Sequence, residues 1–299
     1  MTAEHMGEED LGIKLGRVRR RREGARRCVE KLPGREIRPH SPYYWPMSMQ
    51  LYPSVRPQTI GEVLDTAFKI FSTSLLKALP YGMLMTLIGQ LGNIFDLASG
   101  RPPRRFPPRD SLSWLLFALS MIVSLSLWAA LFMRQRAIAQ GEPVSMRAEL
   151  ASVLHRLPAL LLLTILNVLA VGVGFVLLVV PGVYLLIALW MTVPALLLEN
   201  QAPLDAMKLS LRLIHGNWWR TLAVLLVTIV IVFVFYALSG VFAFIVVQFA
   251  RGADIAVVTA TFAVFVISLG AVSTPFLVAI TLAIFSDLQS RRALVAADP

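Results

Sequence analysis

The sequence predicts an all-α polytopic membrane protein with about six transmembrane helices, arranged as three hairpins with interfacial amphipathic helices. Its 299 residues are 57% hydrophobic and only 15% charged, and the mean hydropathy is +0.68. Such a composition is too apolar for an ordinary soluble domain. Several stretches are also uncharged over the length of about 20 residues that a helix needs to cross a hydrocarbon core of roughly 30 Å. We therefore expect the body of the chain to fold in lipid.

The N-terminal segment, residues 1–56, is expected to be a disordered basic tail. Its first 46 residues contain eleven Lys and Arg against seven Asp and Glu, and they end in a proline-rich stretch. That composition cannot supply an apolar core. Three explanations fit the tail: a cytoplasmic arm on anionic lipid, a contact with nucleic acid, or a start codon assigned upstream of the true one at Met47 or Met49.

The membrane domain is expected over residues 57–290, with a short cytoplasmic tail at 291–299. It opens with an amphipathic helix, because Thr59 and Glu62 have capping-box spacing and apolar residues then recur at helical spacing. Lys69 falls on the polar face of this helix. The segment is too polar to cross a bilayer, so we expect it to lie in the headgroup plane.

Six apolar segments are expected to span the membrane. They cover residues 75–97, 112–133, 157–180, 183–198, 221–249 and 256–285. Pro181 and Gly182 are expected to break the helix between the third and fourth spans, which then form a tight hairpin. Pro275 is expected to kink the sixth span, with neighbouring hydroxyl groups bonding the freed backbone.

A second interfacial helix is expected over residues 203–214. Pro203 suits its first turn, and Leu204, Met207, Leu211 and Ile214 recur at helical spacing. Two tryptophans and an arginine follow, a pattern typical of an anchor at headgroup level. The residues expected to contact lipid are therefore Lys69, Arg212, Trp218, Trp219 and Arg220.

The two amphipathic segments also suggest an internal repeat. Placing Glu62 on Asp205 places Lys69 on Arg212 and Lys77 on Arg220, so both copies read as interfacial helix, short break and span. Residues 144–160 fit as a degenerate third copy, which gives three units of one in-plane helix and one two-span hairpin. Equally, any amphipathic helix before a span would look alike.

The distribution of Lys and Arg near the span ends predicts that both termini are cytoplasmic. Twelve such residues fall on one side and five on the other: Arg101, Arg104, Arg105, Arg109 and Arg251. Four of these five lie in the loop between the first two spans, and a cytoplasmic position of that loop would invert the topology. Cations at span ends are explained by anionic lipid, so we expect no nucleic-acid partner.

Four segments resemble one bacterial family: residues 56–65 (RPQTIGEVLD), 181–185 (PGVYL), 194–199 (PALLLE) and 210–220 (SLRLIHGNWWR). The chain is similar to six-span membrane proteins related to the glycerophosphoryl diester phosphodiesterase membrane domain, and to YciC-type inner-membrane proteins. The resemblance covers nearly everything after Arg56. It implies six spans and a bacterial inner (plasma) membrane location, and it supplies no chemistry. The catalytic barrel of fused relatives would need about 250 further residues, so we expect no hydrolysis.

No residue is assigned to catalysis, to a cofactor or to a metal. Cys28 is the only cysteine, and the four histidines lack the spacing of a metalloprotease helix. The buried polar candidates within the spans are Asn93, Asn167 and Gln248. Hydrogen bonding between helices is the simpler role for each of them.

These features favour a noncatalytic inner-membrane protein whose interfacial helices engage membrane phospholipid or a membrane-protein partner. The alternative is a small-molecule or lipid transporter or translocator. Convergence of the three amides on one water-accessible cavity would favour transport, whereas dispersal over separate helix contacts would favour the noncatalytic role. An intramembrane enzyme would need a nucleophile with its base, and the spans offer no such pair.

Overall fold

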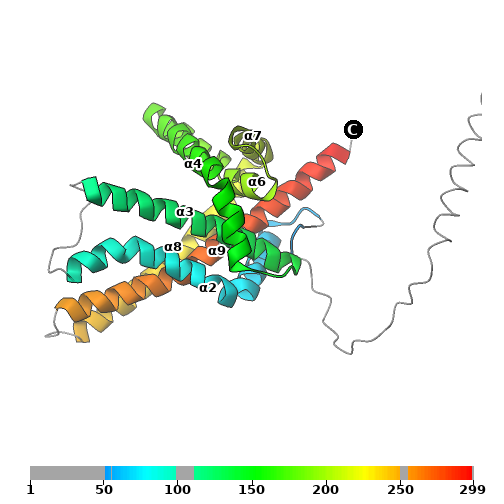
Figure 1. The fold of residues 1–299 in the computed structure, drawn as a ribbon. Helices are drawn as coiled ribbons and strands as arrows, with labels where there is room; N and C mark the ends of the chain where they lie inside the picture. The colour runs from blue at the N-terminus through cyan, green and yellow to red at the C-terminus, as the bar shows by residue number, and fades with distance from the viewer. Residues whose placement is uncertain (1–50, 55, 99–110, 250–254, 298–299) are drawn as a thin grey trace, which may run out of the picture. The chain divides into compact units, whose positions relative to one another are not determined.

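The computed structural model describes residues 51–54, 56–98, 111–249 and 255–297, which lie in the compact unit formed by residues 49–299. Among these described residues all regular structure is helical. The predicted tail up to residue 50 and the arginine-rich loop at 99–110 lie outside them. Figure 1 shows the helices: α2 (Ile60–Ala98), α3 (Ser111–Gln140), α4 (Met146–Leu177), α5 (Val179–Ala188), α6 (Thr192–Leu198), α7 (Pro203–Ile214), α8 (Trp218–Phe249) and α9 (Ile255–Ala297).

Six helical segments are long and apolar enough to cross a membrane, which confirms the predicted all-α polytopic fold. They are Ile60–Gly92, Ser113–Gln140, Met146–Leu177, Val179–Leu198, Trp218–Val246 and Ala263–Val295. Many large apolar side chains on these helices face outward, such as Phe233 at 69% and Val176 at 87% exposure. In water this exposure would be costly, whereas in lipid it is expected. The chain is a multi-pass membrane protein.

The first amphipathic segment differs from expectation, because it is continuous with the first span. The capping box is confirmed: Thr59 N donates to Glu62 Oε2 at 2.7 Å, and Glu62 N donates to Thr59 Oγ1 at 3.3 Å. From there α2 runs for 39 residues without a break. At 1.5 Å per residue it is about 58 Å long, nearly twice the hydrocarbon thickness. The polar first part of α2 must therefore extend beyond the hydrocarbon core.

The third and fourth spans break at places that the sequence did not predict. The chain is extended at Leu178, three residues before the predicted break, and Pro181 sits in the first turn of α5, where its missing N–H costs nothing. A second break separates α5 from α6. There Ser210 of α7 bridges the interrupted backbone, since its hydroxyl donates to Ala188 O at 2.7 Å and accepts from Met191 N at 3.2 Å.

Pro275 lies inside α9, and its own carbonyl accepts a hydrogen bond from another helix; the carbonyl that the proline frees is that of Ala271, four residues earlier, so the predicted hydroxyl partner stays a prediction. Gln135 of α3 is fully buried, and its Nε2 donates to Pro275 O at 2.8 Å. The hydroxyl of nearby Ser273 instead pairs with Tyr236 of α8 at 3.1 Å. The proline region of α9 is thus tied by side chains to α3 and α8.

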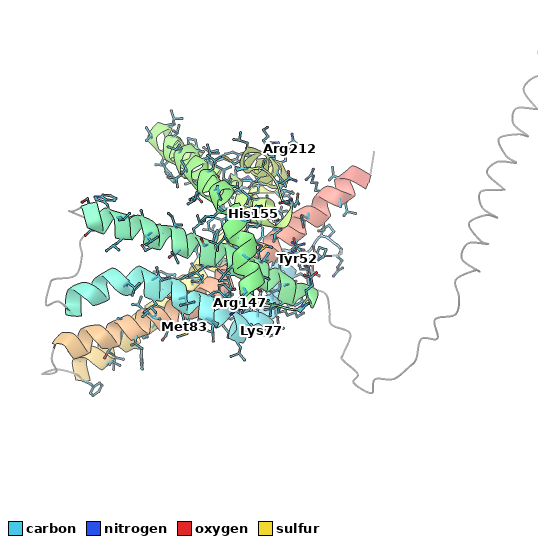
Figure 2. The ribbon with its side chains drawn as sticks, in the orientation of Figure 1. Tyr52, Lys77, Met83, Arg147, His155 and Arg212 are labelled. Carbon is cyan, nitrogen blue, oxygen red and sulfur yellow. The ribbon has the colours of Figure 1, made fainter. Side chains whose placement is uncertain are left out.

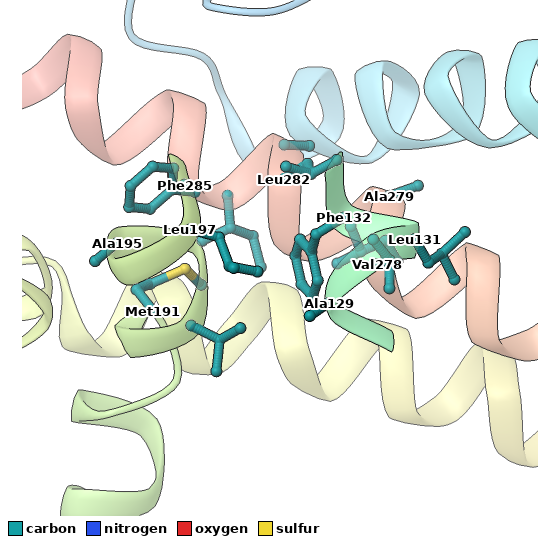
Figure 3. Close-up of a cluster of buried hydrophobic side chains, with 14 of the residues drawn as sticks. Ala129, Leu131, Phe132, Met191, Ala195, Leu197, Val278, Ala279, Leu282 and Phe285 are labelled. Atoms are coloured by element: carbon teal, nitrogen blue, oxygen red, sulfur yellow. The ribbon is translucent and has the colours of Figure 1, made fainter. Parts of the chain in front are cut away.

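The core is built around the second half of α9. Figure 3 shows Phe132 of α3, Leu197 of α6 and Phe285 of α9 among the buried side chains between these helices. Near Ala271, before this part of α9, helices α2 and α9 approach each other closely through small residues. A Cβ on Gly82 would lie 2.7 Å from the carbonyl oxygen of Ala271, so only glycine allows this backbone contact.

The charged side chains that the structure describes gather at one end of the bundle, which we call the polar end. Hydrogen bonds join the helix termini there: Arg134 near the end of α3 pairs with Glu149 near the start of α4, and Gln289 near the end of α9 donates to Glu199 after α6 at 2.5 Å. The other end of the bundle carries the apolar turn at Leu178 and the last residues of α2 and α8.

Candidate functional site

The chain before α2 lies across the polar end, and we call residues 51–54 and 56–58 the N-terminal strap. Leu51 N donates to Ala139 O of α3 at 3.1 Å. Ser54 is bonded twice to Ser286 of α9: its N–H donates to the hydroxyl at 2.5 Å, and its own hydroxyl donates to the carbonyl at 2.9 Å. Residues 51–54, which the sequence assigned to the tail, are therefore part of the folded body.

Tyr52 of the strap is 5% exposed and donates to Gln289 Oε1 at 3.3 Å. Burial raises the pKa of its phenol to about 12, because the phenolate would lose its solvation. The nearby Glu199 carboxylate adds to the rise and the Arg136 guanidinium opposes it. The strap thus depends on a neutral Tyr52.

Asp287 joins the strap to the last two spans. Its Oδ1 accepts from Gln58 N at 2.6 Å, and its Oδ2 accepts from Arg220 Nε at 3.2 Å and Arg291 Nε at 3.0 Å. The side chain is only 3% exposed. A buried carboxylate needs several donors to remain charged, and these three supply them.

A second buried ion pair joins the first three spans. Arg134 Nε lies 2.9 Å from Glu149 Oε2, and the two side chains are 10% and 8% exposed. Tyr81 of α2 donates to the same oxygen at 2.5 Å, and the Arg134 guanidinium lies 4.8 Å from the centre of its ring. Arg134 Nη1 also donates to Lys77 O at 2.8 Å. This cluster fixes α2, α3 and α4 at the level of the polar end.

The two cationic lipid candidates on amphipathic segments are both exposed. Lys69 pairs with Asp65 one turn earlier at 2.7 Å, and its side chain remains 51% exposed. Arg212 lies on α7, at the margin of the molecule in Figure 2. Each can therefore reach groups outside the protein.

The three candidates in the segment 218–220 differ from one another. Trp219 is 77% exposed. Trp218 packs instead against Tyr184 of α5, with ring centroids 5.9 Å apart and stacked planes. Arg220 is held by Asp287 and by the carbonyl of Gln58, to which its Nη2 donates.

Helix α7 packs one stripe against the protein and leaves most of the apolar stripe that recurs in the sequence outside this contact. Ala206, Leu209 and Leu213 face the protein, together with Ile214 of the predicted stripe. Leu204 is 59% exposed and Leu211 is 37% exposed. Lys208 lies between these two leucines on the same helical face, four residues after the first and three before the second. The outward face of α7 thus alternates leucine with lysine.

The two buried amides whose side chains are described lie on different helices, α4 and α8. Asn167 of α4 donates to Thr192 Oγ1 of α6 at 2.7 Å, and Gln248 is near the end of α8. The side chain of Asn93 lies outside the described residues. A cavity of about 390 Å³ between α8 and α9 is lined by apolar residues and by Tyr236, and neither Asn167 nor Gln248 lines it. A transport role for these amides stays a prediction.

Comparison of the chain with protein-family models, with curated proteins and with solved structures gives no match. Within the described ranges, no group of three or more His, Cys, Asp or Glu side chains is placed to hold a metal ion.

Two interacting groups of charges were not predicted from the sequence: Arg134 with Glu149, and Arg291 with Asp287. A charge next to a span is usually solvated, and nothing in the local pattern separates it from a buried one. The available signal was that Glu149 and Asp287 are the nearest acids to spans that otherwise end in arginines.

Proposed function

We propose that this protein is a noncatalytic component of the bacterial inner membrane whose polar end engages anionic phospholipid headgroups, or a membrane-protein partner, on the cytoplasmic leaflet. Both termini are cytoplasmic in this proposal. The resemblance to six-span proteins related to the glycerophosphoryl diester phosphodiesterase membrane domain agrees with it, and is itself part of the proposal.

The outward face of α7 is the observation that carries this proposal. Leu204 and Leu211 remain exposed beside Lys208, although α7 already buries a complete apolar stripe against the protein. A helix face that mixes apolar side chains with cations suits the boundary between acyl chains and phosphates. The lysine stem can lie along the apolar layer while its ammonium group reaches a phosphate.

Trp219 supports the same location. It is 77% exposed and begins the fifth span, just after α7. An indole ring favours the membrane interface, because its ring is apolar and its N–H is a donor. Together, α7 and Trp219 would set the depth of the polar end at the headgroups.

Lipid analysis of the purified protein tests this proposal. The full chain would be extracted into polymer-bounded native discs, and the ratio of anionic to zwitterionic phospholipid would be compared with that of the bulk membrane. We expect enrichment of anionic lipid, and a loss of much of it in a Lys208→Gln, Arg212→Gln double variant. A matched change at exposed Glu142, Glu142→Gln, should leave the ratio unchanged. A wild-type ratio equal to that of the bulk membrane would refute lipid engagement.

A further inference from the structure

Arg220 and Arg291, from different spans, donate to the same two acceptors, and we call them the arginine pair. The Nε atoms of both donate to Asp287 Oδ2, at 3.2 and 3.0 Å, so these two nitrogens are at most about 6 Å apart. The Nη2 atoms of both donate to the carbonyl oxygen of Gln58, that of Arg291 at 2.8 Å. The two guanidinium groups are therefore held side by side.

The arginine pair carries more positive charge than its surroundings neutralise. Asp287 supplies one negative charge for two guanidinium groups. Glu62 of α2 is within electrostatic range of Arg220, but it already pairs with Arg56 at 2.8 Å. Three arginines thus face two carboxylates, and exposed Arg292 adds a further cation on α9. Like charges this close repel one another, which favours binding of an anion.

The charge also faces outward. Asp287 is 3% exposed, whereas the side chains of Arg220 and Arg291 are 23% and 28% exposed. Within the described part of the chain, the hydrogen bonds of each arginine use Nε and Nη2, which leaves both Nη1 groups as donors. Two adjacent guanidinium groups offer several charged N–H donors, which are well suited to the oxygens of a phosphate.

The position of the arginine pair suggests which phosphate would bind. Arg220 directly follows Trp218 and Trp219 at the start of the fifth span, and Arg291 lies in the last turns of the sixth. Both arginines are thus near the level at which the aromatic residues would meet lipid headgroups. A free solute could also reach this level, but phosphate is most concentrated there as phospholipid.

We propose that the arginine pair is a binding site for the phosphate group of an anionic phospholipid. Asp287 and the carbonyl of Gln58 act as positioning groups that hold the two guanidinium groups together. This inference rests on the proposed function and names a particular site for it, which is distinct from the outward face of α7.

Native mass spectrometry of the full chain in a neutral detergent tests the site. Phosphatidylglycerol and phosphatidylcholine would be titrated separately against wild type, Arg291→Gln and Arg291→Lys. We expect wild type to prefer phosphatidylglycerol, and Arg291→Gln to weaken its binding by about tenfold or more, as for the loss of a charge-assisted hydrogen bond. Arg291→Lys keeps the charge without the planar fork, so its affinity should fall between the two. Arg291→Gln retains the bond between Arg220 and Asp287, which favours folding of the variant.

The matched control is Arg292→Gln, because it removes the same charge one residue away from the arginine pair. Its affinity should stay within about threefold of wild type, as expected for a screened surface charge. Equal weakening by Arg292→Gln and Arg291→Gln would overturn the site in favour of diffuse attraction. Inorganic phosphate should not displace the lipid at equal concentration, and displacement would assign the site to free phosphate instead.

Thermal unfolding with and without phosphatidylglycerol distinguishes lipid binding by the arginine pair from a purely structural role. The site predicts that the lipid raises the Tm of wild type and raises that of Arg291→Gln much less. An equal rise in both proteins would show that the arginine pair only joins helices. If wild type prefers phosphatidylglycerol but Arg291→Gln binds it equally well, this inference fails and the proposed function stands. If wild type shows no preference, this inference and the lipid engagement in the proposed function both fail.

Discussion

The buried pair of Arg134 and Glu149 offers the sharpest test of how the first three spans are held together. Replacing Glu149 with leucine would leave a guanidinium group that is 10% exposed without its carboxylate. It would also remove the acceptor of the Tyr81 hydroxyl, now 2.5 Å away. Removal of one partner from a buried ion pair lowers the free energy of unfolding by about 3–5 kcal/mol, and a buried hydroxyl left without a partner lowers it by about 1–3 kcal/mol.

The bond from Arg134 Nη1 to Lys77 O survives this substitution and offsets part of the loss. We therefore expect Glu149→Leu to lower the free energy of unfolding by about 3–5 kcal/mol. Replacing both partners, as Arg134→Met with Glu149→Leu, removes the stranded charge. The double variant should recover most of the loss, because apolar replacements of a buried pair are often close to neutral.

The assay is reversible unfolding in mixed micelles by increasing the fraction of dodecyl sulfate, followed by circular dichroism. Glu142→Leu is the matched control, since Glu142 is an exposed glutamate between α3 and α4. It should change the free energy of unfolding by less than about 0.5 kcal/mol. A loss below about 1 kcal/mol for Glu149→Leu, or a double variant as unstable as the single one, would refute the reasoning.

Two further outcomes follow from packing and from pKa. Gly82→Leu should lower the free energy of unfolding by about 1–3 kcal/mol or more, because its Cβ would lie 2.7 Å from the Ala271 backbone. Gly89→Leu is the control and should have little effect, because there is open space around Gly89. Unfolding in the same micelles compares the two variants. The pKa of Tyr52 is raised from 10.0 to about 12, so its contribution to stability is fully present below pH 10 and is lost as the pH rises through 12. The Tm of wild type should fall more steeply than that of Tyr52→Phe over this range, and equal slopes would contradict the assignment.

The sequence predicted those features that depend on one segment alone. Six spans, the capping box at Thr59 and Glu62, and the separate helix that begins at Pro203 all follow from local composition and spacing. Hydrophobic periodicity and cap residues act within a few turns of one helix, so they can be recognised without knowledge of the partner helices.

Features that depend on two segments were not predictable in this way. The continuity of α2 through the amphipathic segment follows from the packing of Val63, Ala67 and Ile70 within the core, which periodicity cannot assign to a neighbour. Likewise, Glu149 and Asp287 look like solvated charges in the sequence, and only their donors on other helices show that they are buried. In α7 the sequence indicated the apolar stripe that faces outward at Leu204 and Leu211, but not the adjacent stripe that packs against the protein, because that stripe depends on neighbouring helices.

Cysteine accessibility in membranes tests most directly the claim that the long helices lie in lipid with the polar end outside it. In a Cys28→Ser background, single cysteines would replace Val230 in the middle of α8, which is 59% exposed, and Glu142 on the connection between α3 and α4, which is also exposed. An impermeant maleimide should leave Val230→Cys unlabelled in intact vesicles of either orientation. It should label Glu142→Cys in only one orientation, which under the proposed topology is the one with the cytoplasmic face outward. Labelling of Val230→Cys in intact vesicles, at the rate seen for Glu142→Cys, would contradict the account.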